Sequence, residues 1–81
     1  MPAVLPQAYS EIIELFASGP SPEAILSFKP SEESQARVRD LLQKSRDGTL
    51  SQEERDELEQ FSHVEHFMRL VKARARQYAS R

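Results

Sequence analysis

The sequence predicts an all-α protein with four helices, a short N-terminal pair followed by a helical hairpin that ends in a long C-terminal helix. Apolar residues recur at helical spacing, and the two glycines and five prolines fall between these segments or near their starts. Serines stand where helices are expected to begin. A length of 81 residues is enough for one small domain, so we expect residues 1–81 to fold as a single helical unit.

The first two helices are predicted over about 7–18 and 22–28. In the first, apolar side chains recur at i, i+3, i+4 and i+7 and are expected to face the core, at Tyr9, Ile12, Ile13 and Phe16. Gly19-Pro20 ends this helix. Ser21-Pro22 starts the second, because a serine hydroxyl can accept from a free backbone N–H and proline suits the first helical position. Residues 1–6 are expected to be flexible.

The third helix is predicted to begin after Ser31 and to end at Asp47-Gly48, where glycine can adopt the left-handed conformation that closes a helix. Its inward-facing residues are predicted to be Val38, Leu41 and Leu42.

The fourth helix starts with a capping box formed by Ser51 and Glu54, and no glycine or proline follows. It is therefore predicted from Gln52 to about Ala79, a length of roughly 40 Å. We expect the first two helices to cover its second half. Its core stripe is predicted to comprise Phe61, Val64, Phe67, Met68, Val71, Ala75 and Tyr78.

The composition excludes several classes of protein. Without cysteine the chain has no disulfide, thiolate zinc site or cysteine nucleophile, so packing alone must hold the fold. No apolar run approaches the ~18 residues of a membrane span, and residues 1–7 lack the pattern of a signal peptide, so we expect a cytoplasmic protein that does not enter membranes. With only two glycines there is no glycine-rich phosphate loop, and no catalytic motif is found; neither enzyme activity nor a cofactor is expected.

The net charge of −2 conceals a strong order of charges along the chain. Residues 49–66 hold six acids and one base, whereas residues 67–81 hold five bases and no acid. The long helix is therefore acidic in its first half and basic in its second half.

One flank of the predicted C-terminal helix is a candidate protein-binding surface. His63, Phe67, Leu70 and Arg74 follow one another at i, i+4, i+7 and i+11, and His66 is adjacent. A long helix has more surface than three short neighbours can cover. Apolar anchors at Phe67 and Leu70, with a polar rim of histidines and Arg74, thus fit a protein partner or a second copy of the chain. The alternative is a wide core in which these side chains are buried.

Arg69, Lys72 and Arg76 project from the other flank of the same helix. They favour, as an alternative function, a homodimeric DNA-associated regulator whose basic helix contacts phosphates. A solvated basic helix end explains the same pattern.

Two further patterns suggest metal ions. The segment from Lys44 to Glu54 resembles the second half of an EF-hand loop, with Gly48 at loop position 6 and Glu54 at position 12. In this register Gln43 and Ser45 replace the carboxylates expected at positions 1 and 3. A degenerate calcium module is therefore an alternative to a plain helical hairpin. The two histidines are one helical turn apart, yet a metal site needs a third ligand, so no metal site is predicted.

From about Ser21 to Ala79 the chain resembles a family of small, largely uncharacterised bacterial proteins. The shared elements are Ser21-Pro22-Glu23-Ala24-Ile25-Leu26, Pro30-Ser31, Leu41-Leu42, Gly48-Thr49-Leu50-Ser51 with Glu54, Glu57-Leu58, Glu65-His66 and Lys72-Ala73-Arg74-Ala75-Arg76. Members resemble antitoxins that accompany nuclease or PIN-type toxins, which implies a non-catalytic partner role. We therefore predict a small helical protein-binding module, in its most specific form an antitoxin-like protein that neutralises a nuclease.

Overall fold

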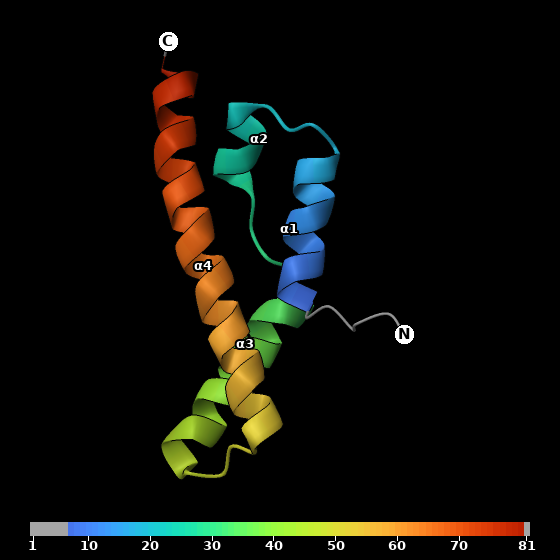
Figure 1. Cartoon of the computed structure of the whole chain (residues 1–81), viewed down its shortest axis with the longest axis vertical. Coiled ribbons are helices and arrows are strands. Elements are labelled where there is room, and N and C mark those ends of the chain that lie inside the picture. Colours follow the sequence, from blue (N-terminus) through green and yellow to red (C-terminus); the bar gives the residue numbers. More distant parts are fainter. Residues whose placement is uncertain (1–6, 81) are drawn as a thin grey trace.

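A computed structural model describes residues 7–80, so the flexibility expected of residues 1–6 lies outside the described part of the chain (Figure 1). The described residues form four helices and no strand: α1 Gln7–Ala17, α2 Pro22–Ser27, α3 Glu32–Asp47 and α4 Gln52–Ala79. The predicted all-α class is confirmed, as are the four helices in their order and the long C-terminal helix.

The helix boundaries follow from local capping chemistry. The hydroxyls of three N-cap serines accept hydrogen bonds from the backbone N–H three residues on, in the pairs Ser21–Ala24, Ser31–Ser34 and Ser51–Glu54. The Glu54 carboxylate accepts in return from the Ser51 backbone N–H, which completes the predicted capping box. Gly48 closes α3 with φ +71°, a left-handed conformation that favours glycine.

Helix α4 is the spine against which the other three helices pack. Figure 1 shows α3 crossing behind the first half of α4 and the short α2 alongside its second half, with α1 on the far side of α2 in this view. The molecule measures 47 × 33 × 19 Å. Since a single helix with its side chains is about 10–12 Å across, a molecule this thin leaves flanks of α4 open to solvent.

The core lies where α1, α3 and α4 meet. Its buried members are Ile12, Leu41, Phe61, Val64 and Met68, and Leu41 has no exposed surface at all. Side chains of α2 and the following loop, including Ile25 and Phe28, pack against this cluster from one side.

The predicted core was too wide. Several large apolar side chains expected to face inward are exposed to solvent, namely Ile13, Phe16, Leu42, Phe67 and Tyr78. Helical periodicity correctly places these residues near the buried stripe of each helix. They remain exposed because the neighbouring helices leave the edges of that stripe uncovered.

Hydrogen bonds of two side chains, Glu11 and Lys72, join distant parts of the chain and hold the helices together. The Glu11 carboxylate on α1 accepts from the Ser31 backbone N–H at 3.0 Å, from the Ser31 hydroxyl at 2.6 Å and from the buried Ser34 hydroxyl at 2.8 Å. A carboxylate at this point also suits the positive end of the α3 dipole. The Lys72 ammonium of α4 donates to the carbonyl oxygen of Phe28 at 2.8 Å, which ties α4 to the end of α2.

Candidate protein-binding face

Two helices contribute exposed apolar side chains to one continuous face. The ring of Phe16 on α1 contacts the ring of Phe67 on α4 edge-on, with 6.2 Å between the centroids. Phe67 nevertheless remains 49% exposed, and Leu70, one turn later on α4, is 58% exposed. Ile13 lies one turn before Phe16 and is also half exposed. We call Ile13, Phe16, Phe67 and Leu70 the α1–α4 face.

The polar residues predicted to surround this face are at the surface as well. His63, His66 and Arg74 are all exposed on α4, and their side chains form no hydrogen bond or ion pair with a described residue. The five residues predicted from the sequence therefore share one solvent-facing flank of a continuous helix. Burial of Phe67 and Leu70 in a wide core, the alternative interpretation, is wrong for this chain on its own.

The contribution of α1 to the face was not predicted from the sequence. Ile13 and Phe16 were expected in the core, but only Ile12 of that stripe is buried. The sequence indicates this only weakly, because two apolar residues at i and i+3 give the same pattern whether neighbouring helices cover one side of their helix or two.

The basic residues of the other flank are partly engaged within the chain. Arg69 pairs with Glu65 one turn earlier, with 2.8 Å between Nη2 and Oε1. Lys72 is half-buried and holds the Phe28 carbonyl. Arg76 is exposed. The three cations thus do not form a uniform ridge of unpaired charges.

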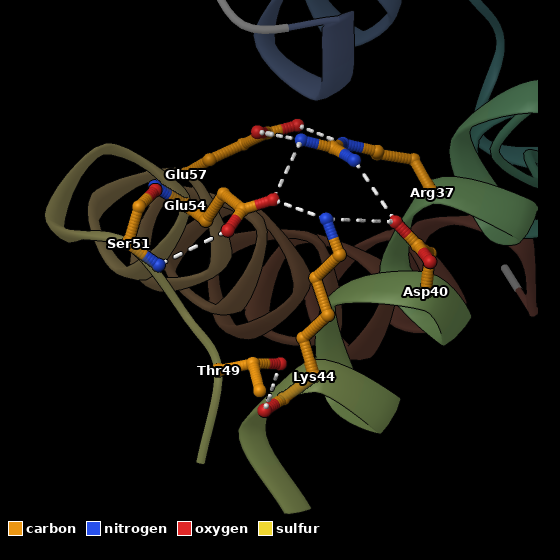
Figure 2. Close-up of polar contacts among 7 residues, drawn as sticks. All are labelled: Arg37, Asp40, Lys44, Thr49, Ser51, Glu54 and Glu57. Atoms are coloured by element: carbon orange, nitrogen blue, oxygen red, sulfur yellow. Dashed lines mark hydrogen bonds and ion pairs between the residues drawn. The ribbon is translucent and has the colours of Figure 1, made fainter. Parts of the chain in front are cut away.

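A network of charges joins α3 to the start of α4 (Figure 2). The Arg37 guanidinium donates to both carboxylate oxygens of Glu57, each at 2.8 Å, in the bidentate geometry that suits this pair. The Lys44 ammonium donates to Glu54 at 2.6 Å, and Asp40 lies within 4.0 Å of both cations. The network orients the two arms of the hairpin.

These contacts shift the protonation equilibria of the acids. The hydrogen bond from Lys44, supported by the Ser51 backbone N–H, lowers the pKa of Glu54 to about 2. The hydrogen bond from Arg37 lowers the pKa of Glu57, and Glu57 in turn raises the pKa of Arg37. Glu54, the carboxylate at position 12 of the EF-hand-like segment, therefore already binds Lys44 and caps α4.

A second apolar surface lies between α3 and α4, on the flank of α4 away from the α1–α4 face, and extends to α1 and to the loop between α2 and α3. It is a half-open groove of about 570 Å³ lined by Val38, Leu42, Leu58, Phe61 and Met68, with Arg69 and Lys72 at its edge. Most of these side chains belong to the core or pack against it. The groove is therefore the outer edge of the core, with Leu42 as its exposed apolar side chain.

Residues 7–80 contain no group of three or more His, Asp or Glu side chains placed to hold a metal ion. None of the helices described is long and apolar enough to cross a membrane. No protein family matches the chain, and neither a curated protein nor a solved structure is significantly similar to it. The resemblance to antitoxins therefore stays a prediction.

Proposed function

We propose that this chain is a non-catalytic protein-binding module and that the α1–α4 face is its binding surface. The observation that carries the proposal is the cluster of Ile13, Phe16, Phe67 and Leu70, four large apolar side chains from two helices that are between 38% and 58% exposed. Contiguous apolar surface with a polar rim is typical of protein interaction sites, whereas isolated exposed apolar residues are common and carry no such meaning.

The composition of the face supports a protein as the ligand. Two phenylalanine rings and a leucine provide the apolar centre, and an arginine and two histidines provide the rim. Aromatic residues and arginine are enriched at protein interfaces, where rings fill pockets and guanidinium groups pair with acids or peptide carbonyls.

Three partly buried carboxylates each bind a group that holds the helices together, which favours a non-catalytic role. Glu11 binds the start of α3, Glu54 caps α4 and holds Lys44, and Glu57 holds Arg37. Each of these acids thus stabilises the fold. The resemblance to antitoxins makes a nuclease the first class of partner to test.

The test compares three tagged proteins: the wild-type chain, Leu70→Asp on the α1–α4 face, and Leu42→Asp as a matched control. Leu42 is a 41% exposed leucine in the middle of α3, so the control introduces the same charge at a similar site outside the face. Binding is measured by quantitative mass spectrometry of proteins retained from the native cell, and then with the purified partner. We expect a partner that the wild type and Leu42→Asp retain and Leu70→Asp loses. Equal retention by all three proteins would contradict the proposal.

A further inference from the structure

The flank of α4 that carries the α1–α4 face has an ordered arrangement of charge. Glu59 lies before its apolar centre and Arg74 lies after it, with His63, Phe67 and Leu70 between them. At about 100° per residue these five side chains project within one sector of the helix. The flank is therefore acidic at one end, apolar in the middle and basic at the other end.

We infer that a second copy of this chain docks on the α1–α4 face with its α4 antiparallel to the first. This inference rests on the proposed function and names the partner. In an antiparallel pair centred between residues 66 and 67, Glu59 of each copy lies level with Arg74 of the other. In the same register His63 lies level with Leu70, and His66 lies level with Phe67. The surface is thus complementary to itself, as a two-fold interface requires.

Charge decides the orientation of the two helices. A parallel pair would place Arg74 beside Arg74 and Glu59 beside Glu59, and like charges across an interface are unfavourable. The antiparallel pair converts both into opposite-charge contacts and brings the apolar centres together. Since each contact occurs twice by symmetry, every change in one residue acts at two places in the dimer.

Both charged residues are available for such contacts. Glu59 and Arg74 are exposed, and neither forms an ion pair with a described residue of its own chain. Three other acids of α4 are engaged internally: Glu54 with Lys44, Glu57 with Arg37, and Glu65 with Arg69. The flank that carries the apolar face thus retains an acid and a base for intermolecular pairing.

The test is sedimentation equilibrium of the purified full chain with charge reversals. We expect the wild type to dimerise, and Glu59→Arg and Arg74→Glu each to weaken the dimer by at least about tenfold, because two symmetric contacts become repulsive. An equimolar mixture of the two variants should restore dimerisation. In the mixed dimer the arginine introduced at position 59 of one chain meets the glutamate introduced at position 74 of the other, while the native pair forms at the second site. Arg76→Glu, on the other flank of the same helix, should leave the wild-type affinity unchanged. Circular dichroism confirms that each variant is folded.

Two results would overturn the inference: a wild-type chain that stays monomeric up to about 1 mM, or a mixture of the variants that associates no better than either alone. A monomeric wild type whose Leu70→Asp variant still loses a different protein would overturn only the inference. A monomer with no partner that depends on Leu70 would overturn the proposed function as well.

Discussion

The substitution Leu70→Asp is predicted to leave the monomer folded, whereas Met68→Asp, two residues earlier on α4, is predicted to unfold it. Leu70 is 58% exposed and Met68 is 6% exposed. The two variants therefore introduce the same negative charge, one at the surface and the other in the core. Phe67→Asp is a less specific probe, because that ring also contacts Phe16.

The magnitude follows from the burial of each side chain. Full burial of a leucine contributes about 1.5–3 kcal/mol, so the buried two-fifths of Leu70 contributes roughly 1 kcal/mol. The lower helix propensity of aspartate costs about 0.5 kcal/mol more, and a new i, i+4 pair with Arg74 returns about 0.3–0.5 kcal/mol. The net loss of roughly 1 kcal/mol lowers the melting temperature by about 4–8 °C in a domain of this size.

For Met68 the loss of burial alone is about 2–5 kcal/mol, and an unpaired buried charge costs several kcal/mol in addition. Together these costs rival the whole stability expected for 81 residues, about 4–12 kcal/mol. Both variants are measured by thermal melting with far-ultraviolet circular dichroism, at concentrations where the wild type is monomeric. A Leu70→Asp variant that is unfolded at 25 °C would show instead that Leu70 is a core residue.

Three further predictions concern the contacts that hold the helices. Because the hydrogen bonds from Lys44 and from the Ser51 backbone N–H lower the pKa of Glu54 from 4.5 to about 2, they stabilise the fold fully above pH 4.5, and this stabilisation is lost as the pH falls through 2. The difference in melting temperature between wild type and Glu54→Gln should shrink over that range, and a constant difference would contradict the pairing. Glu11→Ala should cost roughly 1–3 kcal/mol in urea unfolding, because the buried Ser34 hydroxyl loses its acceptor; the exposed control Glu14→Ala should cost little, and equal costs would argue against the contact. Gly48→Ala should cost about 1–2 kcal/mol at φ +71°, since a methyl group there meets no atom within 4 Å and only backbone strain remains; unchanged stability would exclude that strain.

The helices were predictable because their boundaries depend on chemistry within a few residues. Serines at 21, 31 and 51 cap the helices whose starts they predicted, and Gly48 closes α3 as expected. Each of these signals involves groups no more than four residues apart, so a single sequence contains all the information needed.

The packing was less predictable because it depends on contacts between distant residues. The contact between Lys72 and the Phe28 carbonyl spans 44 positions, and the one between Glu11 and Ser34 spans 23. Nothing local distinguishes Lys72, half-buried in such a contact, from the exposed Arg76 on the same flank. How much of each helix its neighbours cover also depends on residues far apart in the sequence. This is why Phe16 was expected in the core.

The candidate face was predicted in part. The position of Leu70 outside the main apolar stripe correctly indicated exposure, since a residue at the edge of a stripe needs a second neighbouring helix to be buried. The sequence shows that α4 is acidic in its first half, which contains Glu59, and basic in its second half, which contains Arg74. Whether these two charges can pair with another molecule depends on which flank of α4 stays uncovered.

A distance between two spin labels tests the antiparallel dimer most directly. The chain has no cysteine, so Gln77→Cys provides a single labelling site on an exposed residue near the end of α4. With α4 centred between residues 66 and 67, the rise of 1.5 Å per residue separates the two labels by about 30 Å along the helix axis. Pulsed electron paramagnetic resonance on the wild-type background should give that distance, and Leu70→Asp should abolish the coupling. Labels that lie side by side, as in a parallel pair, or no dipolar coupling at concentrations near 1 mM, would contradict a second copy docked on the α1–α4 face.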